Sequence, residues 1–577
     1  MSKKLYFDAK EFNNIKQIIY NSAEIYSNNT AFVIKNNKDG KISYTNISYR
    51  ELLEDINYLG TAFYFLGMKN KRIAIIGKNR YEWILTHLSN LLGGIVSIPL
   101  DKDLQMEELE NSLIRSKADA VVFDKKMLDL IENIKGRGNT AIKEYVCMEE
   151  VDGYRNVHEL IKKGKEIIEN GNKEYIDNKI DENELSIILF TSGTTSKSKA
   201  VMISQKNIAS NIYALQCVED IRSTDTNIAF LPLHHIFGSV GLLMMLASGV
   251  KTAFPDGLRY IKQNMKEYKV SVFVVVPVLT EAMYKAIQKE IERQGKAKLV
   301  KRVIKFSNFL LKFHIDLRRK LFKQILDNLG GELRLIISGG AAADPLFIEG
   351  FKELGIETVQ GYGMSETGPV ISAENYIKRR PGSVGVPMNN IETKIVNKNE
   401  EGIGEIVVKG PNVMLGYYEM PEITNEVKKD GWFYTGDLGY FDKEGFLYVT
   451  GRNKNLIVLK NGKKVFPEEL ETMINRIDLV KECMVFGMKD KDDESDIKVS
   501  VKIVFDDEII KEKYNNKDDE ELKKEVWEKI KKVNMTFPRY KHIQGLITSH
   551  EELIKTTTKK VKRQEEMKLI MQMEENK

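Results

Sequence analysis

The chain has 577 residues, of which 42% are hydrophobic and 30% are charged. This composition provides enough apolar material for a large core and excludes an intrinsically disordered chain. The 88 Lys and Arg residues against 83 Asp and Glu residues give a net charge of +5. So small an excess argues against a dedicated nucleic-acid-binding protein, and we expect no nucleic-acid partner.

Three cysteines, Cys147, Cys217 and Cys483, lie far apart in the sequence. They predict neither a disulfide framework nor a zinc site, and they favour a reducing compartment. The N-terminus has basic residues but lacks the apolar region of a signal peptide. The longest nearly uncharged apolar run, 236–250, is shorter than the roughly 20 residues that a membrane span needs. We therefore expect a soluble, cytoplasmic protein.

The first predicted element is an amphipathic helix, because Phe12, Ile15, Ile19, Ala23 and Tyr26 recur at helical spacing. Beyond it, short apolar runs alternate with helical stretches. Several runs show no polar alternation, which is typical of parallel strands that are covered on both faces. The runs are 72–76, 95–98, 120–123, 187–190, 272–276 and 333–337. This pattern predicts an α/β fold with mainly parallel sheets.

The composition changes near residue 380. From about 380 to 450 the chain is rich in Gly and Pro and has short alternating runs, which predicts a β-rich subdomain. Beyond residue 451 the chain is highly charged and mixes strand and helix. We expect a large N-terminal domain, 1–453, that includes the β-rich part, and a small α+β domain, 454–577.

A stretch of hydroxyl residues and glycine follows the predicted strand 187–190 and precedes Lys199. Backbone N–H groups and hydroxyls in such a stretch can converge on phosphate oxygens, and a lysine adds a point charge. We therefore predict an ATP-phosphate loop here, with a flexible Ser/Thr loop as the alternative. Its residues are Thr191, Ser192, Gly193, Thr194 and Thr195.

The segment 191–200, TSGTTSKSKA, resembles the phosphate loop of the adenylate-forming superfamily, which includes acyl-CoA synthetases, peptide-synthetase adenylation domains and luciferases. Lys199 matches the lysine of that motif, whereas Ser196, Ser198 and Ala200 replace Gly, Pro and Gly. The resemblance extends from about residue 20 to residue 563. It implies a small C-terminal domain that moves, and ATP as a substrate.

Two further segments are similar to family motifs. The segment 231–238, LPLHHIFG, is similar to PLxHxxG, which assigns His235 to the acyl pocket; a histidine packed in the core is the alternative. The segment 338–342, SGGAA, resembles the adenine-binding turn. Glycines at the end of a strand let a flat ring approach the backbone. This resemblance implies that Gly339, Gly340 and Ala341 contact adenine.

The segment 361–367, GYGMSET, resembles the family motif YGxTE. The resemblance implies that Tyr362 stacks on adenine, with Gly361 and Gly363 beside it, that Ser365 lies near the phosphates and that Glu366 holds Mg²⁺. Thr191 is assigned as a second Mg²⁺ ligand. One carboxylate plus ATP oxygens suits Mg²⁺, which usually keeps several waters.

Three C-terminal motifs complete the resemblance. WFYTGD, 432–437, is similar to WxxTGD and assigns Asp437 to the two ribose hydroxyls, for which a carboxylate with two acceptor oxygens is suited. GRNKN, 451–455, implies a ribose or phosphate contact for Arg452 and the interdomain hinge for Lys454. IKTTTKKVKR, 554–563, resembles PKTxxGKIxR, which makes Lys560 the catalytic lysine. The stretch 456–471 looks like the long-chain acyl-CoA synthetase branch.

The resemblance implies two reaction steps. A carboxylate attacks the α-phosphorus of ATP while Lys560, Lys199 and Mg²⁺ on Glu366 neutralise charge, and coenzyme A then attacks the acyl-AMP. We expect an AMP-forming ligase for medium- to long-chain fatty acids. The alternatives are an enzyme that loads a carrier protein, an aryl-acid CoA ligase, and a catalytically silent binding protein.

The segment 296–323 carries ten basic residues and one acidic residue, Asp316, interleaved with apolar residues. A basic amphipathic helix of this kind is typical of membrane surfaces. A solvated helix with a core-facing stripe is the alternative. We therefore expect peripheral contact with an anionic membrane at its inner surface.

Overall fold

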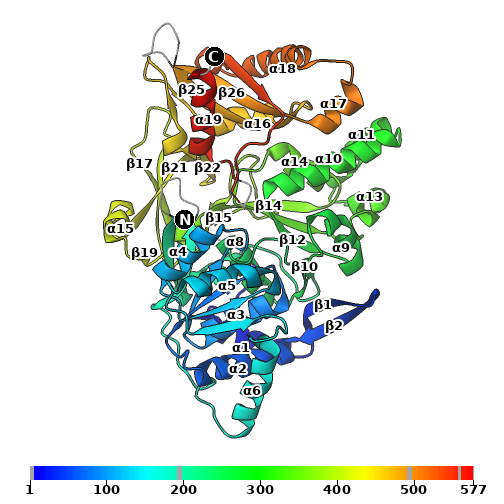
Figure 1. Ribbon diagram of the computed structural model, residues 1–577. Helices are drawn as coiled ribbons and strands as arrows, with labels where there is room; N and C mark the ends of the chain where they lie inside the picture. The colour runs from blue at the N-terminus through cyan, green and yellow to red at the C-terminus, as the bar shows by residue number, and fades with distance from the viewer. Residues whose placement is uncertain (1–5, 192–197, 490–496, 557–559, 576–577) are drawn as a thin grey trace. The chain divides into compact units, whose positions relative to one another are not determined.

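The computed structural model describes residues 6–191, 198–489, 497–556 and 560–575 (Figure 1). The chain divides into two compact units. The first consists of Met1–Gly193, Lys197–Thr393 and Val408–Phe433, and the second of Thr194–Ser196, Lys394–Val407 and Tyr434–Lys577. Residues 434–453 thus belong to the second unit, together with the C-terminal part of the chain. The expected domain boundary between residues 453 and 454 remains a prediction.

The largest sheet of the first unit has eight strands in the order β19-β9-β8-β4-β3-β5-β6-β7. Neighbouring strands from β8 to β7 are parallel, whereas β9 is antiparallel to β8 and β19. The central strands are buried on both faces, which explains their unbroken apolar runs. The strands are β3 (Arg72–Ile76), β4 (Val96–Leu100), β5 (Ala120–Phe123), β6 (Glu144–Cys147), β7 (Arg155–Asn156), β8 (Leu185–Thr191), β9 (Lys199–Ser204) and β19 (Gly416–Tyr417).

A second sheet of the first unit has the order β12-β13-β14-β15-β16. Strands β12, β13 and β14 are parallel, and Ser338 at the end of β13 lies opposite Gln360 of β14. Because parallel strands end at the same edge, this register places the SGGAA turn beside the GYGMSET segment. The strands are β12 (Val272–Val275), β13 (Leu335–Ser338), β14 (Glu357–Gly363), β15 (Val370–Ala373) and β16 (Val386–Pro387).

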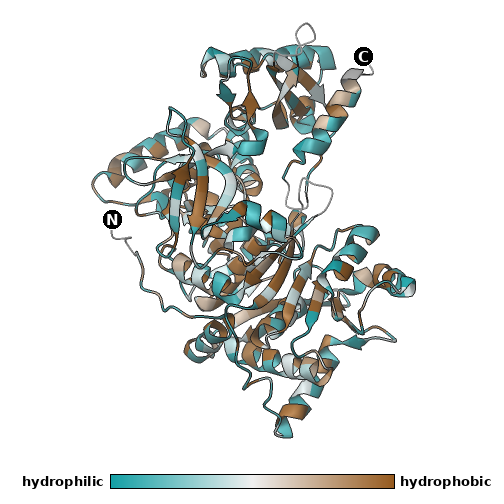
Figure 2. Ribbon diagram, turned by 90° about the vertical axis from the view of Figure 1, so that its left-hand side faces the viewer, coloured by the Kyte–Doolittle hydropathy of each residue, from teal (hydrophilic) through white to brown (hydrophobic). Residues whose placement is uncertain are grey.

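A third sheet of the first unit has the order β10-β11-β1-β2. Figure 2 shows that strands of this unit are largely hydrophobic, while its helices mix hydrophilic and hydrophobic residues. The strands are β1 (Thr30–Lys38), β2 (Lys41–Ser48), β10 (Thr226–Ile228) and β11 (Lys251–Ala253). The helices are α1 (Ile15–Ile25), α2 (Tyr49–Phe65), α3 (Tyr81–Leu92), α4 (Met106–Ser116), α5 (Leu128–Arg137), α6 (Val157–Glu169), α7 (Gln205–Gln216), α8 (Ile236–Ala247), α9 (Ile261–Tyr268), α10 (Pro277–Arg293), α11 (Ala297–Leu311), α12 (Arg318–Leu321), α13 (Lys323–Asp327), α14 (Pro345–Glu353) and α15 (Pro421–Val427).

The second unit has a core of its own around the sheet β25-β26-β27. Leu522, Val526 and Ile530 of α18 are buried in that core, as their helical spacing predicts. The β-rich part contains the strands β17, β18, β21 and β22. The remaining elements are β17 (Glu392–Val396), β18 (Gly404–Lys409), β20 (Lys428–Lys429), β21 (Trp432–Phe441), β22 (Leu447–Arg452), β23 (Ile457–Val458), β24 (Lys464–Val465), β25 (Val480–Lys489), β26 (Ile497–Phe505), β27 (Gly545–Ser549), α16 (Pro467–Ile474), α17 (Asp507–Lys513), α18 (Asp519–Asn534) and α19 (Arg563–Glu575).

The basic segment 296–323 is not one helix. Helix α11 ends at Leu311, and His314 has a φ of 60° before α12 begins. Arg318 is buried, bonds to Asp316 and Glu357, and donates to Lys352 O at 2.7 Å. Arg319 donates to three backbone carbonyls. The side chains of these two arginines therefore hold the fold together and do not form an exposed basic face.

No helix within the described ranges is long and apolar enough to cross a membrane. Most of the apolar run 236–250 instead forms α8 (Ile236–Ala247), whose residues pack into the core of the first unit. Cys147, Cys217 and Cys483 are free and buried.

Candidate active site

Tyr417 brings two of the predicted catalytic residues together in the first unit. Its hydroxyl donates to Glu366 Oε1 at 2.8 Å, and Lys199 Nζ lies 4.7 Å from the centre of its ring. Strand β19 carries Tyr417 and pairs with β9, which begins at Lys199. Burial, and then the negative charge of Glu366, raise the pKa of Tyr417 well above its ordinary value. The tyrosine therefore remains a neutral hydrogen-bond donor to Glu366.

The two ends of the predicted phosphate loop are paired. Thr191 ends β8, lies opposite Lys199 in register, and donates to its carbonyl oxygen at 3.3 Å. Arg115 of α4 donates to Ser198 O at 2.9 Å and to Ser198 Oγ at 3.2 Å. Ser192, Gly193, Thr194 and Thr195 lie outside the described residues. The loop thus starts and ends on adjacent antiparallel strands.

The predicted adenine turn follows β13. A side chain at either of its two glycines would be sterically or conformationally unfavourable. A Cβ atom on Gly339 would lie 2.9 Å from the Phe237 ring, and Gly340 has a φ of +86°. Residue 341 is an exposed alanine of the same turn. In the neighbouring strand, a Cβ atom on Gly363 would lie 1.9 Å from Pro369 O. Both predicted adenine-binding segments therefore have backbones that a larger residue would displace.

Around Tyr362 the chain leaves β14 and enters a short 3₁₀ turn, Ser365–Thr367. Gly361 and Tyr362 are half-buried at the end of this strand, and Ser365 and Glu366 are half-buried in the turn. Met414 N donates to Glu366 O at 2.9 Å and fixes the backbone of the turn. Glu366 is therefore held through both its main chain and its side chain.

His235 is the N-cap of α8. Its Nδ1 accepts from Phe237 N at 3.3 Å, so the ring is fixed at the start of the helix. The preceding residue, His234, lies 3.5 Å from Asp101, and burial lowers the pKa of His234. His235 is half-buried, and its assignment to the acyl pocket remains a prediction.

Asp437 and Arg452 form a pair in the second unit. They lie opposite each other in β21 and β22, and Arg452 Nε lies 3.1 Å from Asp437 Oδ1. Asp437 is buried, whereas the Arg452 side chain is 45% exposed. Gly451 of β22 has a φ of +156°, and a Cβ atom there would lie 2.6 Å from Glu468 Oε2 of α16. The pairing places a buried carboxylate beside a solvent-accessible cation.

Lys454 lies in the 3₁₀ helix Asn453–Asn455, directly after β22. Lys560 is exposed and lies on one side of a hairpin of the same unit, where its backbone N–H donates to Thr556 Oγ1 at 3.1 Å. The predicted residues thus form two groups. Asp437, Arg452, Lys454 and Lys560 belong to the second unit, and the described residues of the other motifs belong to the first.

Glu366 and Thr191 carry donor groups of the kinds that bind a magnesium ion. Mg²⁺ in nucleotide sites usually takes one or two protein oxygens together with phosphate oxygens and waters. Glu366 offers a carboxylate and Thr191 a hydroxyl, and the described ranges contain no larger His, Cys, Asp or Glu cluster that could hold a metal. These residues suit an ion that arrives with ATP.

Two residues of this site were not predicted from the sequence. Tyr417 lies in a strand of only two residues, and Arg115 lies on α4, far from every motif. The doublet Tyr417-Tyr418 after Gly416 was the only available signal for the first. Nothing in the sequence connects Arg115 with Ser198, because their contact arises from the packing of α4.

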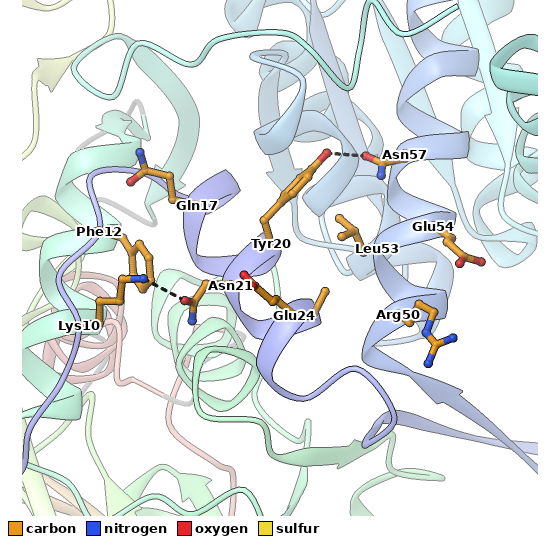
Figure 3. A pocket seen from close by; sticks show the side chains of 11 residues that line it. Lys10, Phe12, Gln17, Tyr20, Asn21, Glu24, Arg50, Leu53, Glu54 and Asn57 are labelled. Carbon is orange, nitrogen blue, oxygen red and sulfur yellow. Dashed lines mark hydrogen bonds between the residues drawn. The ribbon is translucent and has the colours of Figure 1, made fainter. Parts of the chain in front are cut away.

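A separate hollow lies elsewhere in the first unit. It has a volume of about 780 Å³ and lies between α1 and α2. Figure 3 shows Tyr20 pointing to Asn57 across it, with Lys10 bonded to Asn21 at its edge. None of its lining residues belongs to a predicted motif, so it does not form part of this site.

Comparison with known proteins identifies the class. The AMP-binding enzyme family model matches residues 20–418, and the model of the AMP-binding enzyme C-terminal domain matches residues 454–570. The chain therefore belongs to the AMP-binding enzyme family, and it is an adenylate-forming ligase.

Relatives and solved structures are consistent with this class. The chain is 30% identical over 480 residues to long-chain-fatty-acid–CoA ligase 5 of Rattus norvegicus, covering 77% of this chain and 69% of the relative. It is 26% identical over 557 residues to the chloroplastic long-chain-fatty-acid–[acyl-carrier-protein] ligase AEE15 of Arabidopsis thaliana, covering 83% and 75%.

The fold is that of solved family members. An anthranilate CoA ligase in complex with anthranoyl-AMP has a TM-score of 0.75 at 19% identity, with 98% of each chain covered. ATP-bound MatB from Rhodopseudomonas palustris has a TM-score of 0.72 at 23% identity, with 96% of this chain and 97% of that chain covered. The expected fold is confirmed: a large α/β domain, a β-rich subdomain and a small C-terminal domain.

Proposed function

We propose that this protein is an AMP-forming ligase that converts medium- to long-chain fatty acids into acyl-CoA thioesters. The observation that carries the proposal is the arrangement in which Tyr417 contacts both Glu366 and Lys199 beside the paired ends of a phosphate loop. The fatty acid is suggested by the ligase from Rattus norvegicus, of which 69% is covered by this chain. ATP is suggested by the family and by ATP-bound MatB.

In the first step, a carboxylate oxygen of the fatty acid attacks the α-phosphorus of ATP. The bond from that phosphorus to the bridging oxygen breaks, and pyrophosphate leaves. Such reactions are catalysed mainly by positioning and by neutralising charge. Lys199 and Lys560 supply positive charge, Asp437 holds the ribose, and Tyr362 stacks on adenine. When Mg²⁺ is bound by Glu366 and Thr191, it neutralises charge on the phosphates.

In the second step, the thiol sulfur of coenzyme A attacks the acyl carbonyl carbon, AMP leaves, and the thiol proton is released. The protein needs no nucleophile of its own for this step, because the sulfur of coenzyme A attacks the carbonyl directly; its three cysteines are buried. Between the two steps, rotation of the C-terminal domain about Lys454 would withdraw Lys560 from the acyl-AMP and give the thiol of coenzyme A access to it.

The names of two similar proteins suggest alternative substrates that can be tested. The Arabidopsis relative is named for a carrier-protein acceptor, and the anthranilate ligase for an aryl acid. ATP–pyrophosphate exchange across a panel of acids tests the acid, and free coenzyme A against holo-carrier protein tests the acceptor. Exchange that depends on C8–C18 fatty acids, followed by transfer to free coenzyme A, is the expected result. Exchange only with aryl acids would refute the fatty-acid assignment.

We further propose that the protein binds peripherally to the inner surface of an anionic membrane through α11. Leu299, Phe306 and Phe309 are spaced so that they share one face of α11. They are 56%, 54% and 54% exposed, and Phe313, just beyond the end of α11, is 60% exposed. The opposite side contains buried Ser307 and packs against α10 and α14. The exposed face is therefore aromatic and solvent-accessible.

A row of lysines borders this face. Lys298 and Lys305 of α11 and Lys312, the residue that caps the end of the helix, are exposed and recur every seven residues, so they lie on one side of the aromatic stripe. Aromatic rings beside lysines are what an interfacial helix presents to lipid headgroups. Each such lysine should contribute about 1 kcal/mol to binding an anionic surface.

Co-sedimentation with phosphatidylglycerol-containing vesicles tests the membrane proposal. Changing Lys298, Lys305 and Lys312 to Gln should abolish binding, and binding of the wild type should weaken as salt rises from about 0.01 M to 0.15 M. The control removes three exposed lysines of α6, Lys162, Lys163 and Lys165, in the same way. Equal effects of both triple variants, or no binding by the wild type, would refute the proposal. Arg318 and Arg319 are unsuitable targets because they hold backbone carbonyls.

A further inference from the structure

The hairpin that carries Lys560 has a well-defined base in the second unit. Lys562 N donates to Ile554 O at 2.8 Å, and Thr556 N donates to Lys560 O at 2.8 Å. Lys555 and Val561 form the antiparallel bridge between these two hydrogen bonds. The position of Lys560 therefore depends on where the base of the hairpin is fixed.

Glu566, in the first turn of α19, holds both sides of that base. Its Oε2 accepts from Ile554 N at 3.0 Å, and its own N–H donates to Lys562 O at 3.0 Å. Its Oε1 forms an ion pair with Lys502 Nζ. The side chains of Glu566 and Lys502 are only 1% and 5% exposed.

Lys502 connects this contact to a rigid element. It lies on β26, the central strand of the sheet, opposite Met484 of β25 and Ile547 of β27. The hairpin base is thus connected to the middle of a three-stranded sheet. The residue before Ile554 is also held by this sheet: Leu553 N donates to the carboxylate of Glu482, on β25, at 2.9 Å.

A buried ion pair is weak evidence for stability, because a well-packed apolar pair usually serves the fold as well. An apolar side chain, however, cannot accept the N–H of Ile554. The distinguishing feature of Glu566 is therefore a hydrogen-bond acceptor that is held at a fixed point beneath the hairpin.

We propose that Glu566, anchored by Lys502, is a positioning residue that sets the location of Lys560 for the adenylation step. The inference rests on the role of Lys560 in the proposed function. Glu566 does not touch the reacting atoms; it acts through the backbone of Ile554. Misplacement of a catalytic group by about 1 Å can cost roughly 100-fold in rate.

Two double variants separate positioning from folding. Lys502→Met with Glu566→Leu replaces the ion pair by an apolar pair and removes the acceptor for Ile554 N–H. Lys502→Met with Glu566→Gln also removes the charges but keeps a carbonyl oxygen in the acceptor's place. Unfolding by denaturant, measured for both, shows whether each is folded.

Two rates are then compared in the folded proteins: fatty-acid-dependent ATP–pyrophosphate exchange, and thioester formation from supplied acyl-AMP and coenzyme A. The Leu variant should lose about 10- to 100-fold in exchange kcat relative to the Gln variant, while thioester formation remains equal. Glu565→Ala, which removes an exposed ion pair with Lys562, is the control and should change neither rate.

Equal exchange rates for the Leu and Gln variants, or parallel losses in both half-reactions, would overturn the positioning role. Failure of the wild type to show any acid-dependent exchange would instead refute the proposed function, so the two failures can be distinguished.

Discussion

At the scale of single residues, Tyr417 joins parts of the site that the sequence shows only as separate motifs. Its hydroxyl restrains the carboxylate that is proposed to hold Mg²⁺, and its ring lies beneath Lys199. Sequence patterns predicted Glu366 and Lys199 because both stand in motifs. They could not predict Tyr417, because its role depends on the pairing of β19 with β9.

Tyr417→Phe removes the hydroxyl and keeps the ring. Outer-shell partners of metal ligands typically contribute 10- to 100-fold to metal affinity. We therefore expect the Mg²⁺ concentration for half-maximal exchange to rise by about 10-fold or more. Tyr418→Phe, whose hydroxyl contacts Arg72 instead, is the control. An unchanged Mg²⁺ dependence would show that Tyr417 does not restrain the metal ligand.

Lys560→Ala should abolish adenylation and leave thioester formation from supplied acyl-AMP largely intact. The lysine is expected to neutralise charge only in the first transition state, so its removal affects that step alone. The two half-reactions are measured separately. A greater loss in Lys562→Ala than in Lys560→Ala would mean that the motif has been assigned to the wrong lysine.

At the scale of elements, apolar runs predicted the central strands well, since residues buried on both faces leave an unbroken hydrophobic signal. Strands β3 and β5 begin and end where their runs do. The segment 296–323 was predicted less well. No glycine or proline interrupts it, yet α11 ends at Leu311. The contacts that fix Arg318 and Arg319 come from distant segments, which the local pattern cannot reveal.

Lys454→Pro tests the hinge. Proline fixes φ and restricts the preceding residue, so the 3₁₀ helix Asn453–Asn455 would be locked. We expect adenylation to continue and transfer to coenzyme A to fall. Lys454→Ala removes the same side chain but leaves φ free, and it should lose much less. Unchanged overall turnover in the proline variant would exclude Lys454 as the pivot.

Two buried carboxyls near the end of α7 predict a pH-dependent stability. Burial, and then the charge of Glu374, raise the pKa of Glu219 from 4.5 to about 8; burial likewise raises the pKa of Glu374 to about 8. The folded protein therefore binds more protons than the unfolded chain between about pH 5 and 8. As the pH rises through this range, the free energy of unfolding should fall by about 1.4 kcal/mol per pH unit for one such carboxyl.

Glu219→Gln removes one of these carboxyls. Denaturant unfolding between pH 5 and 8 should give a shallower decline for this variant than for the wild type, with higher stability at pH 8. Glu132→Gln, at an exposed position of α5, is the control. A wild-type stability that does not fall with pH would contradict the assignment.

At the scale of the whole molecule, the motifs run in order along nearly the full chain, and this order predicted the family that the comparisons show. The limits of the compact units were harder to predict. The second unit includes 394–407 as well as 434–577, because strands far apart in sequence pair in its sheet. The acyl chain length is equally hidden, since the walls of an acyl site are set by packing.

The central claim is acid-dependent transfer of AMP, and one measurement tests it directly. The wild type is incubated with α-labelled ATP, Mg²⁺ and palmitate without coenzyme A, and coenzyme A is then added. Before coenzyme A is added, we expect labelled palmitoyl-AMP and unlabelled pyrophosphate. After it is added, the adenylate should disappear while labelled AMP and palmitoyl-CoA are released. Formation of labelled ADP, or no adenylate with any fatty acid tested, would contradict it.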